Sequence, residues 1–213
     1  TVIVTLTNTQ LIGTDCNWAI IYTFSVKDEC NNTLSGQQMI LSGSDQTPPT
    51  FTRPADITIY SNEACVYNAG VGVTGDVTNE SDQCSSGLNA TFTDVVVSGS
   101  CQCSYIITRT WHLVDACGNA APNQVQTINV YSNIVTNTND SGAGSLRDII
   151  SCAPAGSTVT FSPTLMGQNI VLTSGEIVIN KDLTLNGLGI ANSMISGNNA
   201  SRIFHLMPGM QFT

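Results

Sequence analysis

Charged residues are scarce in this sequence, and basic ones are scarcest. They make up 10% of the 213 residues, with six Lys and Arg against fifteen Asp and Glu, which gives a formal net charge of −9. No cluster of basic residues is present that could neutralise phosphates, and the net negative potential would repel a polyanion. The composition therefore argues against a nucleic-acid partner.

Long stretches of Ala, Glu, Lys and Leu, which favour helices, are also missing. No apolar run approaches the roughly 18 residues that a membrane-spanning helix needs. Thr, Ser, Asn, Val and Ile fill the sequence instead, and these are typical of strands and turns. We therefore expect an all-β protein that does not insert into a membrane.

The motifs that usually mark an enzyme are absent as well. There is no Gly-x-Ser-x-Gly elbow, phosphate loop or dinucleotide fingerprint. His112 and His205 have no second ligand at metal-binding spacing. A glycoside-cleaving carboxylate pair in the last third of the chain would have to be Glu176 and Asp182, with Lys181 beside the latter. We interpret these as turn and edge residues, and we expect neither catalysis nor a cofactor.

What the sequence does have is cysteine: eight residues, at positions 16, 30, 65, 84, 101, 103, 117 and 152. None forms the Cys-x-x-Cys pair of a zinc site, and the spacing from Cys101 to Cys103 is too tight for one. Disulfides are the better interpretation, and they imply an oxidising compartment. We therefore expect a secreted or cell-surface protein.

An internal repeat organises the first part of the chain. Residues 16–32 align without a gap with residues 103–119, at a constant offset of 87. Both cysteines match, and aromatic character is retained at Phe24 and Trp111. Upstream, Thr-Leu-Thr-Asn at 5–8 resembles Thr-Phe-Thr-Asp at 91–94 at an offset shorter by one. The alignment predicts one complete module over residues 47–132, preceded in residues 1–46 by the C-terminal half of another.

Short strands separated by turn signals predict a β-sandwich for the complete module. Phe24 and Trp111 are the expected core aromatics. Arg109 shares the face of Trp111, and Tyr22 takes its place in the first copy, for which the sequence offers no explanation. We expect the strands near residues 57–60, 65–73, 89–97, 104–114 and 124–130.

The sandwich limits which cysteines can pair. Cys103 and Cys117 flank one long strand and so lie roughly 30 Å apart at about 3.3 Å per residue, too far for a disulfide. Cys84 is expected at the same end as Cys117, and Cys65 at the other end. We predict a Cys84–Cys117 bridge, and a bridge from Cys65 to either Cys101 or Cys103.

By the same reasoning Cys16 and Cys30, which flank the equivalent strand of the first copy, need partners that this chain does not supply. The chain starts at Thr1 without a charged and then apolar leader, so we expect a mature or partial chain.

Acidic residues gather in the loops near the predicted Cys84–Cys117 bridge. Asp76, Asn79, Glu80, Asp82 and Asp115 offer hard oxygen ligands of the kind that calcium takes, if the loops share an end of the sandwich. Asp76, Asp82 and Asp115 are the calcium candidates. Alternatively, these residues are solvated turn carboxylates that orient the bridge.

From residue 133 the pattern changes. A strand and a glycine turn lead into a short helix, with Ser145 as its N-cap and Leu146, Ile149 and Ile150 on one face. Short Val/Ile/Leu strands with Asn/Gly corners follow. They predict the first coils of a right-handed parallel β-helix over residues 133–213, capped by the helix. We expect these strands near 158–161, 169–173, 176–179, 182–186, 193–196 and 202–206.

Two resemblances follow from particular motifs. Ser-Asp-Gln-Thr-Pro-Pro-Thr-Phe at 44–51 and Asp-Ala-Cys-Gly-Asn at 115–119 resemble the hyalin-repeat class of immunoglobulin-like modules, as found in large secreted surface adhesins of Bacteroidetes-type bacteria. The first copy departs from this pattern at 28–32, where the turn has no Gly. Ser-Leu-Arg at 145–147 followed by Thr-Val-Thr-Phe at 158–161 resembles the start of right-handed β-helix domains of bacterial surface proteins.

The resemblances imply a non-enzymatic extracellular protein of a bacterial cell surface that acts as a stalk or adhesin segment. One alternative is a fibre subunit that self-associates head to tail, since an open half-sandwich and an open β-helix both expose unpaired strand edges. A weaker alternative is a protein that binds or cleaves polysaccharide, with surface glycans as its partners.

Overall fold

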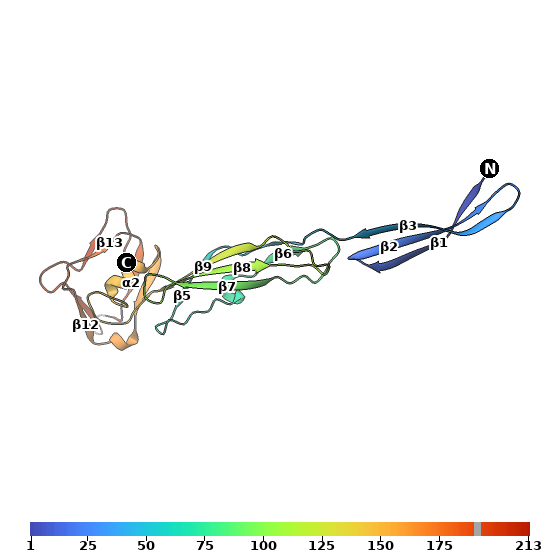
Figure 1. The fold of residues 1–213 in the computed structure, drawn as a ribbon. Coiled ribbons are helices and arrows are strands. Elements are labelled where there is room, and N and C mark those ends of the chain that lie inside the picture. Colours follow the sequence, from blue (N-terminus) through green and yellow to red (C-terminus); the bar gives the residue numbers. More distant parts are fainter. Residues whose placement is uncertain (190–192) are drawn as a thin grey trace. The chain divides into compact units, whose positions relative to one another are not determined.

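Strands are the main regular elements of the chain (Figure 1). The computed structural model describes residues 1–189 and 193–213. Strand accounts for 47% of the chain and helix for 7%, which confirms the all-β class. Two compact units are present, one made of Thr1–Arg53, Val77–Phe92 and Thr110–Gln124, the other of Pro54–Asp76, Thr93–Arg109 and Val125–Thr213.

The first unit contains an antiparallel sheet formed by β1 (Ile3–Thr14), β2 (Asn17–Lys27) and β3 (Thr33–Ser44), in that order. The turn from β2 to β3 is closed by Asp28, whose carboxylate accepts hydrogen bonds from both the backbone and the side-chain amide of Asn32, each at 2.8 Å. Both β1 and β3 are exposed along nearly their whole length, and the central strand β2 is half-buried rather than buried.

The first unit also holds a short antiparallel pair, β4 (Thr50–Thr52) and β6 (Thr78–Ser81). Trp111 is 1% exposed and packs edge-on against Phe92, with ring centroids 5.0 Å apart. Trp111 is thus the core aromatic that the sequence predicts. Phe24, its equivalent in the first copy, is only half-buried.

A four-stranded sheet lies mostly in the second unit, and the ends of three of its strands belong to the first. Its order is β5 (Ile57–Ser61), β9 (Gln124–Ser132), β8 (Tyr105–His112) and β7 (Thr91–Ser98), and β5 lies parallel to β9. Ile59, Ile107, Ile128 and Val130 form its buried core. The strands match the expected ones closely, with one exception in the segment that follows β5.

The strand expected at 65–73 is instead a loop that ends in the single helical turn α1 (Val71–Thr74). The Asn62 side chain accepts hydrogen bonds from the backbone amides of Ala64 and Val66, which folds the chain into a tight turn. Cys65 lies within that turn with a φ of 61°, a value that an extended strand does not adopt. Local side-chain hydrogen bonds therefore replace the strand.

Arg109 holds this loop against the sheet. Its side chain is 1% exposed and donates two hydrogen bonds of 2.8 Å to the carboxylate of Asp94. It also donates to the Thr74 hydroxyl at 2.8 Å and to the Ala69 carbonyl at 2.6 Å. Arg109 lies on the core face because it binds the segment that covers that face, which explains its place beside Trp111.

The C-terminal part of the second unit consists of short parallel strands. β10 (Ile134–Val135), β11 (Ser157–Phe161) and β14 (Leu183–Asn186) form one sheet. β12 (Gln168–Val171) pairs with β15 (Ser193–Ser196), and β13 (Ile177–Ile179) pairs with β16 (Phe204–Leu206). In each pair the partner lies about 26 residues further along the chain, close to the expected positions.

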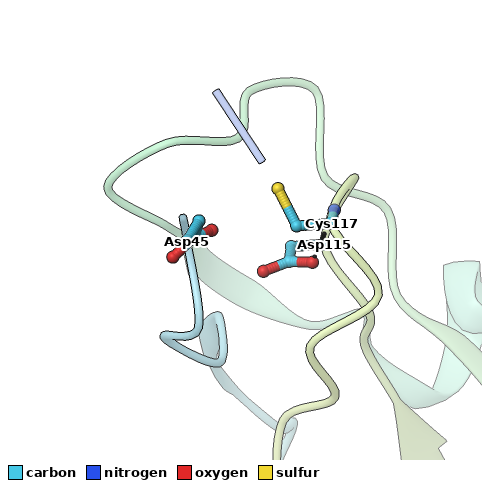
Figure 2. Close-up of side chains that lie close together, drawn as sticks. All are labelled: Asp45, Asp115 and Cys117. Carbon is cyan, nitrogen blue, oxygen red and sulfur yellow. Dashed lines mark hydrogen bonds between the residues drawn. The ribbon is translucent and has the colours of Figure 1, made fainter. Parts of the chain in front are cut away.

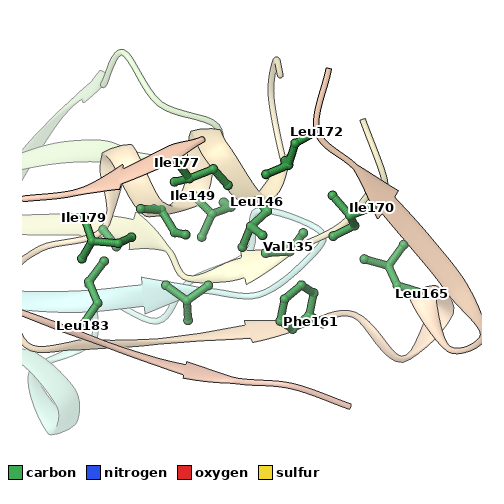
Figure 3. Packing of buried hydrophobic residues seen from close by; sticks show 13 residues of the cluster. Val135, Leu146, Ile149, Phe161, Leu165, Ile170, Leu172, Ile177, Ile179 and Leu183 are labelled. Atoms are coloured by element: carbon green, nitrogen blue, oxygen red, sulfur yellow. The ribbon is translucent and has the colours of Figure 1, made fainter. Parts of the chain in front are cut away.

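Side chains from all three parallel sheets meet in one apolar core (Figure 3). The helix α2 (Leu146–Cys152) adds Leu146 and Ile149, both at most 1% exposed. Ser145 caps this helix as expected, because its hydroxyl accepts a hydrogen bond from the Asp148 backbone amide. A short 3-10 turn, η1 (Pro163–Leu165), adds Leu165 to the core.

Three disulfides are present among the described residues, in agreement with an oxidising compartment: Cys16–Cys117, Cys65–Cys103 and Cys101–Cys152. Of the two partners left open for Cys65, the structure selects Cys103. Cys101 pairs with Cys152, which the sequence left without a partner. Cys30 and Cys84 are free and exposed. In the described part of the chain, no helix combines the length and apolar character needed to cross a bilayer.

The predicted Cys84–Cys117 bridge is wrong, because Cys117 is bonded to Cys16. So is the expectation that Cys16 lacks a partner within the chain. The Asp45 backbone amide donates a hydrogen bond to the Cys16 carbonyl, and the Asn119 side chain donates one to the Asp45 carbonyl. These contacts bring Cys16 to within 5.0 Å of Cys117, measured between Cα atoms, which is a normal disulfide separation.

A first prediction concerns Arg109. Replacing it with Ala leaves Asp94 without its cation and frees the loop that carries Thr74 and Ala69. We expect a loss of about 3–5 kcal/mol in the free energy of unfolding, the usual cost of breaking a buried ion pair. Urea denaturation followed by hydrogen exchange of β8 and β9 measures it.

The matched control is Arg202→Ala, which breaks an ion pair whose Arg is 63% exposed and so costs under about 1 kcal/mol. Equal losses for the two variants would contradict the anchoring role of Arg109.

Candidate functional site

Acidic side chains gather beside the Cys16–Cys117 disulfide. We define Asp45, Asp82 and Asp115 as the acidic cluster. Ligand atoms of Asp45, Asp115 and Cys117 lie within 4.8 Å of one another (Figure 2), and so do those of Asp45, Asp82 and Cys84. Two of the three calcium candidates, Asp82 and Asp115, therefore lie near the carboxylate of Asp45. The third, Asp76, belongs to neither group.

Asp115 is engaged in forming its own turn. One carboxylate oxygen accepts hydrogen bonds of 2.8 Å from the backbone amides of Cys117 and Asn119, and the other accepts one of 2.8 Å from the Asn119 side chain. Burial raises the pKa of this carboxyl, but the hydrogen bonds outweigh burial and leave the pKa lowered. Asp28 accepts the equivalent two hydrogen bonds from Asn32 in the first copy, so the repeated Asp and Asn have a structural role.

Asp45 and Asp82 each use only one carboxylate oxygen for hydrogen bonds. Asp45 accepts one from the Thr47 backbone amide at 3.0 Å. Asp82 accepts two, from the backbone amides of Cys84 at 2.6 Å and Ser85 at 3.0 Å. The remaining oxygens, Asp45 Oδ2 and Asp82 Oδ1, are buried and have no hydrogen-bond partner. A pair of unpartnered carboxylate oxygens is a donor set that suits a hard cation.

The other predicted members of the calcium set have structural contacts. The Glu80 carboxylate accepts a 2.6 Å hydrogen bond from the Ala90 backbone amide, and the Asn79 side chain donates to the Thr52 hydroxyl. Because Cys117 is in a disulfide, its sulfur is no thiolate ligand. Cys84 keeps its thiol, whose pKa is raised by burial and then by the neighbouring carboxylates, which oppose a second negative charge.

The polar residues weighed for catalysis are also held in structural contacts. Glu176 forms an ion pair with Arg202 and lies 2.9 Å from the His205 ring, so His205 has an acidic neighbour that its sequence position does not reveal. The Asp182 carboxylate accepts a 2.7 Å hydrogen bond from the backbone at residue 211. The Lys181 ammonium donates to two carbonyls at the end of α2, at 2.7 and 2.8 Å.

The ring nitrogen of His112 is 2.9 Å from the Asn123 side-chain oxygen. Some of the residues considered for catalysis line a cavity of about 300 Å³. Its walls include Arg147, Glu176 and Lys181. Glu176 and Lys181 already have ionic or hydrogen-bonding partners.

Arg147 and Asp140 form a clamp that sequence reasoning missed. Arg147 donates 2.8 Å hydrogen bonds to the Asp140 carboxylate and the Glu176 carbonyl, and a 2.7 Å bond to the Gly175 carbonyl. Asp140 also accepts a 2.7 Å hydrogen bond from the Ser174 backbone amide. The pair ties the loop before α2 to the turn that leads directly into β13. Its only signal in the sequence is Arg147 within the Ser-Leu-Arg stretch.

A second prediction follows from this clamp. Burial raises the pKa of Asp140, but hydrogen bonds from Ser174 and Arg147 outweigh burial and lower it well below the ordinary range. A lowered folded-state pKa gives stability that is fully present above the unfolded pKa of about 4 and is lost as the pH falls below it.

Asp140→Ala is therefore expected to cost about 1–3 kcal/mol at pH 7, because it leaves the donors of Arg147 and Ser174 unpaired. Between pH 6 and pH 3 the parent chain should lose more stability than Asp140→Asn, as measured by hydrogen exchange of β13. Parallel losses in the two proteins would contradict this role.

The side chains weighed for catalysis or metal binding thus mostly close turns and tie loops to strands, whereas Asp82 and its neighbour Asp45 each have a buried carboxylate oxygen without a hydrogen-bond partner. Comparisons with protein-family models, curated proteins and solved structures find no match for this chain. The residues and their geometry are therefore the basis for assigning a function.

Proposed function

We propose that this chain is a stalk segment of a non-enzymatic protein on the surface of a bacterial cell. In this proposal residues 47–132 are an immunoglobulin-like module, residues 1–46 are half of another, and residues 133–213 are the first coils of a right-handed parallel β-helix. The parallel ladders that recur about every 26 residues around one apolar core support the last assignment.

The observation that carries the stalk proposal is the placement of the disulfides. Cys16–Cys117 joins the first copy of the repeat to the second, and Cys101–Cys152 joins the second copy to the segment of parallel strands. Each junction between successive segments is therefore covalently closed. Junctions are where a row of modules would otherwise stretch first, so such bridges suit a protein that resists tension outside the cell, where disulfides persist.

Stretching single molecules of the full chain tests this proposal. With the bridges intact, the shortest covalent path runs from Thr1 to Cys16, crosses to Cys117, returns to Cys101, and crosses to Cys152 before reaching Thr213. Reduction opens the whole chain and should lengthen the fully stretched molecule by about 40 nm, at roughly 3.4 Å per residue.

Cys16→Ser is the matched control, because it opens only the first junction. The shortest path then crosses Cys65–Cys103 and Cys101–Cys152, and the gain on reduction should fall from about 40 nm to about 29 nm at the same length per residue. An extension that is the same before and after reduction would remove the basis for the stalk.

Calcium binding is a second candidate function, favoured by the two unpartnered oxygens of Asp45 and Asp82. An isolated buried anionic oxygen is costly, and a divalent cation would offset that cost. We expect about 5 mM calcium to raise the melting temperature of the parent chain, since extracellular sites bind calcium at around 10⁻⁴–10⁻³ M. Asp82→Asn keeps a side-chain acceptor and should show no such rise. A parent chain that melts at the same temperature in calcium and in EDTA would exclude the site.

A further inference from the structure

The same three-stranded arrangement occurs twice in this chain, in two different settings. By the repeat alignment, β1, β2 and β3 correspond to β7, β8 and β9, and both sets have the same strand order. In the second copy a fourth strand, β5, adds beside β9 in parallel register, with Ile57 opposite Ile128 and Ile59 opposite Val130. In the first copy the corresponding edge of β3 has no neighbour among the described strands.

Burial along the equivalent strands shows what the extra segment does. Along β9 every second residue is buried, whereas β3 is exposed throughout except at Gly43, which is half-buried. The outer strands β1 and β7 are exposed in both copies. The two copies therefore differ on the side where β5 and the loop after it lie, and there the first copy lacks a cover.

The uncovered face of the first copy is the one that forms the core in the second. Ile107 and Trp111 on β8 are each 1% exposed. Their equivalents on β2, Ile20 and Phe24, are only half-buried. Leu41, which pairs with Ile20 across the sheet, is 51% exposed. The first copy thus has the pattern of a core face without the segment that would bury it.

The edge of β3 also lacks the features that usually keep an exposed edge from pairing. Its sequence, Thr-Leu-Ser-Gly-Gln-Gln-Met-Ile-Leu-Ser-Gly-Ser, contains no charged residue and no proline. Proteins commonly protect free edges with Lys or Pro. Met39 and Ile40 are 55% and 62% exposed near the middle of this strand. The edge is therefore suited to accept another strand.

We propose that β3 and the apolar face of β2 bind the amino-terminal half of another module of the same kind, a segment resembling residues 47–86 of this chain. The equivalent of β5 would add parallel to β3, and the loop after it would cover Ile20 and Phe24. This inference rests on the stalk proposal and names the partner of its first sheet. A second copy of this chain is a poor source, because its own β5 already pairs with its own β9.

One contact of the second copy cannot be repeated in the first. Arg109, which binds the covering loop, is replaced by Tyr22, and its partner Asp94 is replaced by Asn8. The covering segment of the first copy is therefore held by apolar contacts and by strand pairing, without a buried ion pair. Introducing Asn8→Asp and Tyr22→Arg together should supply the missing anchor.

The test adds a copy of residues 47–86 directly before Thr1 of the full chain. This spacing follows from the alignment of Thr5 with Thr91, which places Thr1 opposite Gly87. The cysteines of the added copy are replaced by serine so that they leave the existing bridges unchanged. We expect the backbone amides of β3 to exchange hydrogen at least tenfold more slowly than in the parent chain, with a further slowing when Asn8→Asp and Tyr22→Arg are added.

The matched control carries Asp in place of both isoleucines in the added copy of β5, and it should leave the exchange of β3 at the parent rate. Exchange of β8 and β9, measured in the same samples, reports that the rest of the chain is folded. If β3 exchanges at the parent rate in both fusions while β8 and β9 stay protected, the inference is wrong. It is also wrong if the parent chain dimerises through β3. Neither result bears on the stretched length, so the stalk proposal is judged separately.

Discussion

A sheet three or four strands wide has two faces, and it buries an apolar face only when another segment lies across it. The second copy of the repeat meets this requirement with β5 and the loop from Asn62 to Thr74, held by Arg109. The parallel strands after residue 133 meet it by facing one another around a shared core. The first sheet does not meet it, and Leu41 is therefore 51% exposed, whereas Ile128 at the equivalent position of β9 is fully buried.

The sequence was informative wherever a pattern is local. Alternating apolar residues located β8 and β9, the Ser145 cap located α2, and Asn/Gly corners located the short parallel strands. The prediction of a strand at 65–73 was wrong because the Asn62 side chain accepts hydrogen bonds from two backbone amides and forms a turn. The sequence does not distinguish such an Asn from an exposed Asn in a strand. The role of Arg109 could not be predicted for a similar reason. Ala69 accepts its hydrogen bond through a backbone carbonyl, and every residue type has one.

The disulfides mark the limit of reasoning from separate modules. Cys65–Cys103 was within reach because both residues belong to one copy of the repeat. Cys16–Cys117 and Cys101–Cys152 each cross from one segment to the next, and pairing confined to single modules cannot find them. In the candidate site, the turn role of Asp115 was one of two alternatives that the sequence left open, whereas the unpartnered oxygens of Asp45 and Asp82 depend on loop geometry that the sequence does not contain.

The overlap of the disulfide loops has a consequence for survival among extracellular proteases. Because Cys101 lies between Cys16 and Cys117, the loop closed by Cys101–Cys152 overlaps the one closed by Cys16–Cys117. Every peptide bond from residue 16 to residue 152 is therefore spanned by at least one bridge. A single proteolytic cut in any exposed loop of that region leaves the two fragments joined by a disulfide. The protein therefore keeps the segment on the far side of the cut.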